Sequence, residues 1–245
     1  MRALITGASS GIGYDLARVL SSKYDEIIIV GRNKEKLEEL KNSLNCFVKV
    51  VSIDISKEDN CIKLYNENKN IDLLINCAGF GDCGEFSLTD LNKDLNMINT
   101  NIVGLHILTK LYLSDMKKKD SGHILNVASI AGFMPGPLMA TYYATKNYVV
   151  KLSEAIRVEL KKSNSNVKIS VLCPGPVNTK FNERANVLFS LKGTDSMSVA
   201  KYAVKHLNRF YIIPGFGVKF TRIICHLLSS NIMAKFCYNI QKKKM

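Results

Sequence analysis

Residues 2–13 read Arg-Ala-Leu-Ile-Thr-Gly-Ala-Ser-Ser-Gly-Ile-Gly, and this stretch decides the fold expected for the rest of the chain. An apolar strand comes first, a glycine-rich turn follows, and an amphipathic helix then extends to about Lys23. Glycines let a ligand approach the backbone closely, and a helix N-terminus offers free N–H groups and a positive dipole. The arrangement therefore predicts a site for the pyrophosphate of a dinucleotide cofactor. The residues expected to form it are Gly7, Ser9, Ser10, Gly11, Ile12 and Gly13.

Apolar runs of strand length alternate with helical patterns over the remaining chain. Strands without polar alternation are typical of a buried parallel sheet. The pattern predicts one α/β domain over residues 1–214, with a doubly wound parallel sheet flanked by helices. Further strands are expected at 26–30, 46–53, 71–75, 123–127, 167–173 and 211–213, and helices at 34–42, 57–68, 88–116, 141–162 and 199–208.

Composition narrows the class of protein. The chain has 245 residues, of which 47% are hydrophobic, enough for one domain with a large core. The apolar run at Ala3 lacks the features of a signal peptide, and no uncharged apolar run reaches the length of a membrane span. Seven scattered cysteines without a C-x-x-C pattern indicate reduced thiols and a cytoplasmic protein, and the four histidines lack metal-ligand spacing, so no metal is expected.

The net charge of +13 raises nucleic acid or an anionic membrane as partners. Because the basic residues are spread out and no basic stripe is interleaved with aromatic residues, no nucleic-acid partner is expected.

Cofactor preference is predicted from the end of the second strand. An NAD site usually has an acidic residue there to hold the ribose 2′-hydroxyl, but this chain reads Gly31-Arg32-Asn33. Because Arg32 can bind a 2′-phosphate through its fork of donors, NADP(H) is favoured over NAD(H). The alternative is that Arg32 lies in a solvated loop and NAD(H) is used.

Further cofactor contacts are expected where later strands end. Asp54 could accept a hydrogen bond from the adenine amino group, or it could simply cap the next helix. The turn after the strand at 167–173 could bring Thr179 to the nicotinamide carboxamide, unless Thr179 only caps a helix. The cofactor-binding residues expected at these strand ends are Asp54, Ile55, Asn76, Ala78, Gly79, Pro174, Gly175, Val177 and Thr179.

Tyr142 and Lys146 are candidates for acid–base chemistry. At i and i+4 they share one face of a helix, and a cation there would lower the pKa of the phenol from about 10. The alternative is an ordinary amphipathic helix. Ser129 ends a strand and could orient a substrate. Asn101 interrupts a helical pattern, where it could form a bend that holds a water near Lys146 or could be satisfied by neighbouring backbone.

These motifs, taken in order, resemble the short-chain dehydrogenase/reductase family over residues 2–214. The resemblance rests on Thr6-Gly7-x3-Gly11-Ile12-Gly13, Asp54, Asn76-Cys77-Ala78-Gly79, Asn101, Ser129, Tyr142-x3-Lys146 and Pro174-Gly175. It implies a Rossmann fold with seven parallel strands in the order 3-2-1-4-5-6-7, a catalytic tetrad of Asn101, Ser129, Tyr142 and Lys146, and a homodimer formed through the long helices. Cys77 stands where the family often has a second Asn, and Asn147 stands where a small apolar residue is usual.

The substrate region is predicted from two segments. The apolar loop at 130–138 contains Phe133 and Met134, which with Ser129 and Tyr142 are expected to contact a hydrophobic carbonyl compound. Residues 179–196 are expected to form a mobile lid over it. Tyr143 is the one competitor for Tyr142 as proton donor, but it does not fit the spacing to Lys146.

Residues 215–245 are expected to form a helical extension. Basic residues accompany apolar residues at helical spacing, so the segment could contact an anionic membrane surface, or it could cover the substrate pocket or a dimer surface. Its apolar positions include Phe216, Phe220, Ile223, Ile224, Leu227, Leu228, Ile232, Phe236 and Ile240.

The sequence thus predicts an NADP(H)-dependent oxidoreductase that acts on an alcohol or carbonyl group, with Tyr142 as the general acid/base. Two other functions stay open. One is a non-catalytic protein that binds and senses NADP(H), and the other is an adaptor at a membrane surface.

Overall fold

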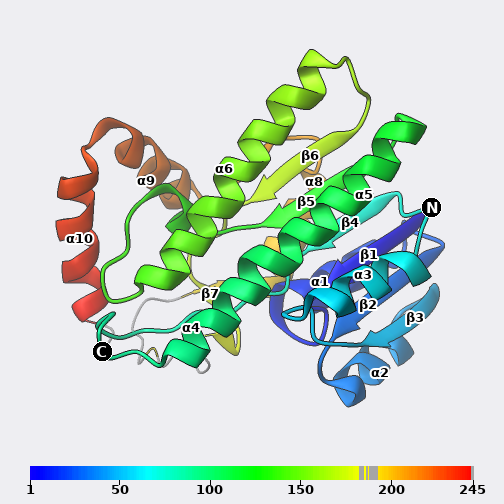
Figure 1. Cartoon of the computed structure of the whole chain (residues 1–245), viewed down its shortest axis with the longest axis horizontal. Helices are drawn as coiled ribbons and strands as arrows, with labels where there is room; N and C mark the ends of the chain where they lie inside the picture. Colours follow the sequence, from blue (N-terminus) through cyan, green and yellow to red (C-terminus); the bar gives the residue numbers. More distant parts are fainter. Residues whose placement is uncertain (182–184, 186, 188–192, 244–245) are drawn as a thin grey trace.

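Helices cover both faces of a parallel sheet in the computed structural model, which describes residues 1–181, 185, 187 and 193–243 (Figure 1). The seven strands run in the order β3-β2-β1-β4-β5-β6-β9. This order confirms the predicted doubly wound sheet, with β9 as the seventh strand. The strands are β1 (Arg2–Thr6), β2 (Glu26–Gly31), β3 (Phe47–Ser52), β4 (Leu73–Asn76), β5 (His123–Val127), β6 (Lys168–Leu172) and β9 (Tyr211–Ile212).

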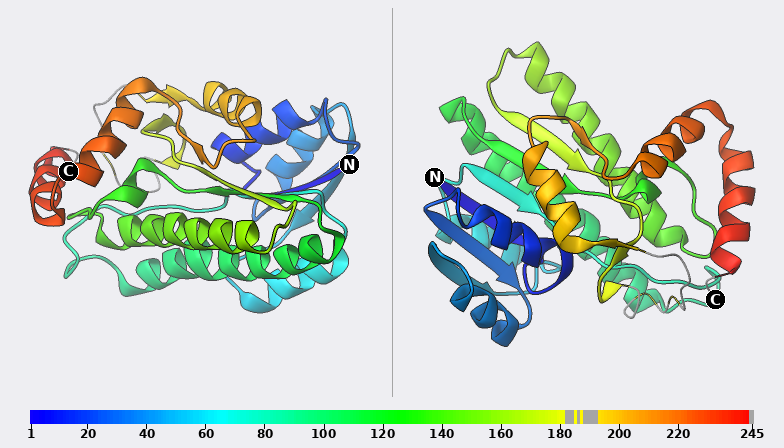
Figure 2. Two further views of the ribbon diagram at one scale, coloured as in Figure 1. Left: turned by 90° about the horizontal axis from the view of Figure 1, so that it is seen from above. Right: turned by 180° about the vertical axis from the view of Figure 1, so that it is seen from behind.

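Two hydrophobic clusters hold the helices against the sheet. Leu4 of β1 points into one cluster, while Ala3 and Ile5 point into the other. The first cluster packs α3 (Glu58–Glu67), α5 (Leu105–Lys119) and α6 (Ala140–Lys162) on one face, and the second packs α1 (Gly11–Leu20), α2 (Lys34–Asn42) and α8 (Ser196–Lys205) on the other (Figure 2). Because both faces are covered, the strands can be apolar throughout, as the sequence showed.

The helix expected at 88–116 is interrupted. It consists of α4 (Leu91–Ile98), a π-helix (Asn99–Gly104) and α5. The start is later than expected because Asp90 caps α4, its side chain accepting hydrogen bonds from the N–H groups of Asn92 and Lys93. The interruption falls where Gly104 packs against the Ile55 carbonyl, since a Cβ at Gly104 would lie 2.4 Å from that oxygen. Single π turns of this kind occur often at functional sites.

Two short strands form a feature that the sequence did not predict. Val177–Asn178 (β7) and Thr194–Asp195 (β8) pair in parallel. This pairing places Thr194–Asp195, which directly precede α8, beside Val177–Asn178 in the turn after β6.

The C-terminal extension folds into α9 (Phe216–Leu227) and α10 (Ser230–Lys242). The inner face of α10 buries Met233 and Cys237 against Met134, with Ile130 and Tyr143 beside them. The views in Figures 1 and 2 show α10 near the first turns of α6. The inner face of the extension therefore packs on the fold and is not available to a membrane surface. No helix in the described part of the chain is both long and apolar enough to cross a bilayer.

Candidate active site

The glycine-rich turn has the geometry of a cradle for phosphate. Gly7 and Gly11 have φ of +70° and +60°, and a Cβ at Gly7 would lie 2.7 Å from the backbone of Ala78. A Cβ at Gly13 would lie 2.5 Å from the Gly7 carbonyl oxygen. Ser10 caps α1 without a side-chain hydrogen bond, so its side chain does not satisfy the first N–H groups of the helix, and Gly11, Ile12 and Gly13 of that first turn line the pocket. This backbone fits a cofactor pyrophosphate.

Thr6 joins the carboxyl ends of β1 and β4. Its hydroxyl accepts hydrogen bonds from the N–H groups of Cys77 and Ala78, at 3.0 and 3.2 Å. The small residues after β4 are thereby held against the glycine-rich turn, where a ligand can lie along both.

Arg32 and Asp54 both line the pocket that the glycine-rich turn also lines. Arg32 is exposed, and its small neighbour Gly31 packs on Ser9, whose hydroxyl would lie 3.3 Å from a Cβ at Gly31. Asp54 accepts a hydrogen bond from the Ser56 N–H at 3.0 Å, whereas the residue that caps α3 is Lys57. Asp54 therefore does not cap the following helix.

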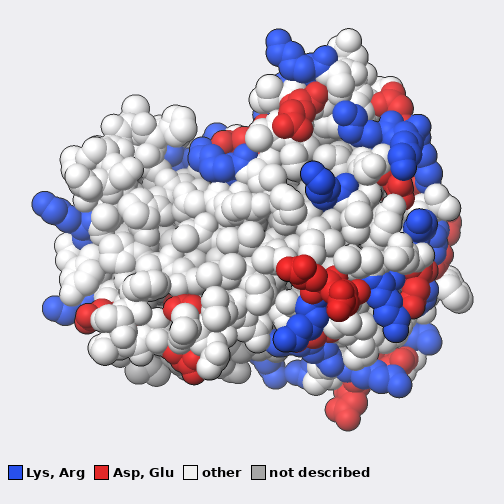
Figure 3. Space-filling model, viewed as in Figure 1, with Lys and Arg blue, Asp and Glu red and all other residues white. Residues whose placement is uncertain are grey.

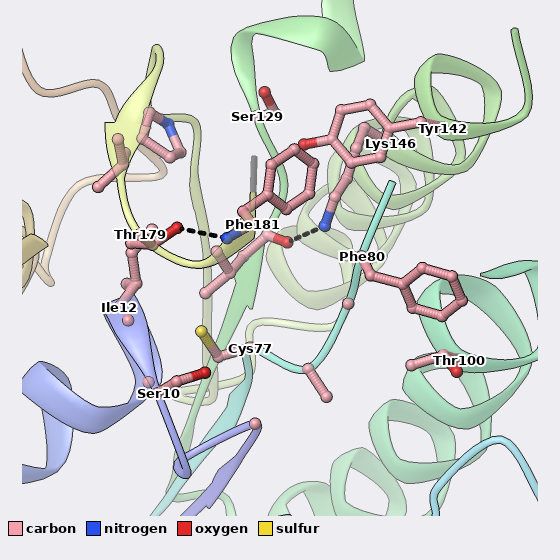
Figure 4. Close-up of a pocket in the computed structure, with 18 of the residues that line it drawn as sticks. Ser10, Ile12, Cys77, Phe80, Thr100, Ser129, Tyr142, Lys146, Thr179 and Phe181 are labelled. Carbon is pink, nitrogen blue, oxygen red and sulfur yellow. Dashed lines mark hydrogen bonds between the residues drawn. The ribbon is translucent and has the colours of Figure 1, made fainter. Parts of the chain in front are cut away.

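One continuous pocket contains nearly all the predicted cofactor contacts. The predicted residues that line it are Gly7, Ser9, Ser10, Gly11, Ile12, Gly13, Arg32, Asp54, Ile55, Ala78, Gly79, Tyr142, Lys146, Pro174, Gly175, Val177 and Thr179, together with Ser129. Thr179 is held there by its hydroxyl, which accepts a hydrogen bond from the Phe181 N–H at 3.2 Å (Figure 4).

Asn76 is an exception, because it does not line the pocket. Its side chain is 2% exposed and donates hydrogen bonds to Thr109 and Asn126, both at 3.0 Å. Asn126 in turn donates to Ser153. Asn76 therefore belongs to a buried polar network that joins β4 and β5 to α5 and α6, and the expected cofactor contact does not match its position.

Tyr142 and Lys146 meet at the other end of the pocket, close to Ser129 (Figure 4). Burial raises the pKa of Tyr142 to about 12, and hydrogen bonding with Ser129 opposes this rise without reversing it. The pKa was expected to be lowered by Lys146, but the Lys146 Nζ lies 5.9 Å from the centre of the Tyr142 ring and donates to the Val127 carbonyl instead, at 2.9 Å. Tyr142 therefore keeps its proton at neutral pH and is suited to act as an acid.

Lys146 is a buried cation, with 6% of its surface exposed. Burial lowers the pKa of its ammonium group from 10.5 to about 8. The neighbouring Gly79 leaves room for the Asn101 amide, because a Cβ there would lie 2.9 Å from the Asn101 Oδ1. The group is charged at neutral pH and close to its titration point.

Asn101 lies in the π-helix and anchors the site through its amide. Its Nδ2 donates to the Phe80 carbonyl at 2.9 Å and to the Thr145 hydroxyl at 3.0 Å, and its Oδ1 accepts from the Phe80 N–H at 3.1 Å. The bend expected at Asn101 is present, but its amide holds protein groups. Asn101 thus ties the loop after β4 to the residue that precedes Lys146.

Comparison with known proteins identifies the family of the chain. The family model for short chain dehydrogenases matches residues 1–187. The chain belongs to the short-chain dehydrogenase family. A relative from Staphylococcus epidermidis, described as an uncharacterized oxidoreductase, is 38% identical over 188 residues, which are 74% of this chain and 80% of the relative. The chain is therefore an NAD(P)-dependent oxidoreductase of this family.

Two solved structures share the fold at 24% identity and a TM-score of 0.83. A short-chain dehydrogenase from Sphingobium yanoikuyae in complex with NADPH matches over 92% of this chain and 93% of its own. A short-chain dehydrogenase/reductase from Burkholderia phymatum in complex with NAD matches over 92% of both chains. The two proteins are in complex with different nucleotides, so the fold alone does not select one.

Asn147, one of two departures from the family pattern, has a clear structural role. Its Nδ2 donates to the carbonyls of Ala131, Met134 and Tyr143, at 2.9–3.0 Å. Ser129 caps the short 3₁₀ helix (Ile130–Phe133) in this loop, and its hydroxyl accepts a hydrogen bond from the Ala131 N–H. Asn147 therefore fastens the loop that carries Ser129 to the helix that carries Tyr142 and Lys146.

Cys77, the other departure, lines the pocket. Burial raises the pKa of its thiol to about 12, so it brings no charge to the cofactor region.

The substrate end differs from the prediction. Phe133 packs on Tyr211, with ring centres 5.8 Å apart, and Met134 is buried beneath α10. Neither lines the pocket. Other side chains line the pocket, among them those of Phe80, Ile130, Met139, Tyr143, Phe181 and Gln241.

Part of the expected lid at 179–196 lies outside the described residues. Within the described part, the Phe181 ring lies over Tyr142, with centres 5.2 Å apart (Figure 4). Gly81 permits this contact, because a Cβ there would lie 2.8 Å from the Phe181 ring. The aromatic character of Phe181 was the one signal in the sequence for its position, and nothing in the sequence singled out Gln241.

Proposed function

We propose that this protein transfers hydride between NADP(H) and an alcohol or carbonyl group on a hydrophobic substrate, with Tyr142 as the general acid/base. One observation carries the proposal. Ser129, Tyr142 and Lys146 line the same pocket as the glycine-rich turn, so acid–base groups and a phosphate cradle face one space. The apolar side chains at the substrate end, such as Ile130 and Met139, favour a hydrophobic compound.

The chain's own residues account for the proton in this reaction. When bound, the nicotinamide cofactor supplies the hydride to the carbonyl carbon. Ser129 donates a hydrogen bond that orients the carbonyl oxygen. Tyr142 transfers its phenolic proton to that oxygen, so the C=O group becomes CH–OH and a phenolate remains. In the resting site the Lys146 Nζ donates to the Val127 carbonyl, and its charge acts on Tyr142 only after the proton has left, when it stabilises the phenolate. Asn101 positions the backbone around both residues. The same steps in reverse oxidise the alcohol.

Arg32 supports the preference for NADP(H). Its guanidinium lies at the pocket edge beside Gly31, and the described strand end offers no carboxylate in the place that a 2′-hydroxyl would need. We expect Arg32→Ala to raise the KM for NADPH about tenfold and leave that for NADH nearly unchanged. Equal KM values for NADPH in both proteins would refute the preference.

The decisive experiment is a panel of hydrophobic ketones and aldehydes, assayed in parallel with NADPH and NADH. The wild type is expected to oxidise NADPH, and Tyr142→Phe is expected to bind NADPH but lose at least about a hundredfold in kcat. Retained turnover in Tyr142→Phe would refute the role of Tyr142 as the general acid/base. A wild type that binds NADPH and turns over none of the panel would favour the NADP(H)-sensing alternative.

We also propose a homodimer. Leu91 and Leu95 on α4 and Val158 on α6 are exposed apolar side chains. Burial of such side chains against a second copy would stabilise a pair. Light scattering should give twice the chain mass of 27.3 kDa, and the monomer mass at micromolar concentration would contradict the proposal.

The outer face of the C-terminal helices supports a contact with an anionic lipid surface, which we propose for an enzyme that works in the cytoplasm. The sequence after Asp195 contains no acidic residue, and Figure 3 shows few charged side chains over α9 and α10. Exposed cations accompany the apolar side chains at Lys219, Lys235 and Lys242. Such an arrangement favours shallow insertion, with about 1 kcal/mol for each well-placed cation. The exposed apolar residues are Phe216, Phe220, Ile223, Leu227, Leu228, Ile232, Phe236 and Tyr238.

Vesicle flotation tests this contact. The full chain should float with phosphatidylglycerol vesicles and not with phosphatidylcholine vesicles. The double change Phe220→Ser and Phe236→Ser should abolish flotation, whereas Phe47→Ser, an exposed aromatic on β3, should not. Flotation that is absent in the wild type, or unchanged in the double variant, would contradict the contact.

A further inference from the structure

Gln241 brings a buried amide to the substrate end of the pocket. It lies in the last turn of α10 and is 2% exposed, yet it lines the same pocket as Tyr142. Its Nε2 donates a hydrogen bond to the Tyr143 hydroxyl, whereas its Oε1 has no hydrogen-bond partner among the described residues. A buried carbonyl without a donor is costly and uncommon in folded proteins. Its position in a binding pocket indicates that a ligand donor can satisfy it.

Tyr143 holds this amide in place. Its ring meets that of Tyr142 edge to face, with centres 6.0 Å apart, so the two phenols belong to adjoining parts of one site. Gly136 leaves room for the Tyr143 ring, because a Cβ there would lie 2.0 Å from it. Burial raises the pKa of Tyr143, so its hydroxyl stays protonated and neutral. The residue that does not serve as the acid therefore serves as the anchor of Gln241.

The surroundings of Gln241 make its carbonyl oxygen stand out. Met134, Met233 and Cys237 form a buried apolar cluster against which Tyr143, the hydrogen-bond partner of Gln241, packs, and Met139 and Ile130 line the same pocket as Gln241. A substrate whose body is apolar would fill this end well. Only a compound that also carries a hydrogen-bond donor away from the reacting carbonyl would satisfy the Gln241 oxygen.

We propose that Gln241 is a specificity-determining residue, which accepts a hydrogen bond from a hydroxyl at the end of the substrate far from the reacting carbonyl. This inference rests on the proposed function and names its substrate class as hydrophobic hydroxy-ketones. The C-terminal extension, beyond the residues that the family model matches, thus supplies the contact that selects the substrate.

Binding in the absence of turnover tests the proposal. Calorimetry on the full chain with saturating NADP⁺ measures affinity for two pairs of probe ketones. The pairs are para-hydroxyacetophenone with acetophenone, and para-hydroxybenzylacetone with benzylacetone. Because NADP⁺ carries no hydride, the ketones bind without reacting. For at least one pair, the wild type should bind the hydroxylated ketone about tenfold more tightly.

Three variants test whether Gln241 causes the preference for the hydroxylated ketone. Gln241→Met, similar in length and apolar, should reduce it to within about twofold, and Tyr143→Phe should weaken it because the amide loses its anchor. Met233→Leu changes the same face of α10 without touching the amide and should keep the preference. Thermal unfolding confirms that each variant is folded.

The possible outcomes separate the two proposals. A wild type that binds none of the four ketones, or that binds both members of each pair equally, would overturn the role of Gln241. A preference for the hydroxylated ketone that survives in Gln241→Met would overturn it too. A preference that disappears in Gln241→Met, without turnover of any probe by NADPH, would support the role of Gln241 and contradict the proposed reaction.

Discussion

Replacement of Lys146 by Met should make the protein more stable and inactive. Lys146 is almost fully buried, and burial lowers its pKa from 10.5 to about 8, a fall of about 2.5. At 1.36 kcal/mol for each pKa unit, the buried charge costs about 3 kcal/mol at pH 7. Met is unbranched and apolar, so it can occupy the same space without charge.

The gain is smaller than this cost because a hydrogen bond is also lost. The Lys146 Nζ donates to the Val127 carbonyl at 2.9 Å, and removal of this donor costs about 1–2 kcal/mol. The net expected stabilisation is about 1–2 kcal/mol, or a rise in Tm of about 2–8 °C for a chain of this size. Turnover should fall at least about a hundredfold, because the phenolate of Tyr142 loses its cation.

Urea denaturation at several pH values measures the effect, and its sign can be stated. Below about pH 8, the wild-type lysine is charged in both the folded and the unfolded state, so the full cost of burial applies. Between about pH 8 and 10.5 the folded protein binds fewer protons than the unfolded chain, so wild-type stability rises with pH relative to the variant. The advantage of Lys146→Met should therefore shrink over this range.

Lys151→Met is the matched control on the same helix. The Lys151 side chain is 64% exposed and pairs with Glu154, so its loss should change stability by less than about 0.5 kcal/mol. If Lys146→Met is less stable than the wild type at pH 7, or if its advantage is the same at pH 7 and pH 10, the reasoning about the buried charge is refuted.

Three further predictions follow from the same site. Asn147→Ala removes the two hydrogen bonds from α6 to the Ala131 and Met134 carbonyls of the Ser129 loop and should cost about 1–3 kcal/mol in urea denaturation, so an unchanged midpoint would count against this role. Gly7→Ala should abolish NADPH binding in a fluorescence titration, since φ is +70° and the Cβ would meet Ala78 at 2.7 Å, while Gly217→Ala, with no atom within 4 Å of its Cβ, should bind normally. Ketone reduction should be constant from pH 6 to about 7.5 and decline as Lys146 loses its charge near pH 8, whereas a rate that rises through pH 8 would contradict this assignment.

Much of the fold could be predicted because its signals are local. The apolar runs of β1, β2 and β4 need only their own residues to be recognised, and the glycines at 7 and 11 are required by the turn's own backbone, with φ near +60° to +70°. Spacing along one helix likewise places Tyr142 and Lys146 on one face. The interruption at Asn101 was also visible as a poor helix former within an apolar helix, although its hydrogen-bond partners were not.

The contacts that were mispredicted depend on how elements pack. Asn76 ends a strand beside the cofactor region, but its side chain points to Thr109 and Asn126, because those groups need a buried partner there. Met134 lies under α10, a helix that begins almost a hundred residues later in the chain. The pKa of Tyr142 depends on burial, which spacing along the sequence does not measure.

Local signals in the sequence therefore sufficed for the family, the sheet and the spacing of the acid–base groups, because each depends on residues close together in the chain or on motifs in a recognisable order. What surrounds these groups depends on tertiary packing. The hydrogen bond between Gln241 and Tyr143 joins residues 98 positions apart. Two helices must pack before those side chains meet, and the burial that leaves the Gln241 oxygen without a partner among the described residues exists only in the folded chain.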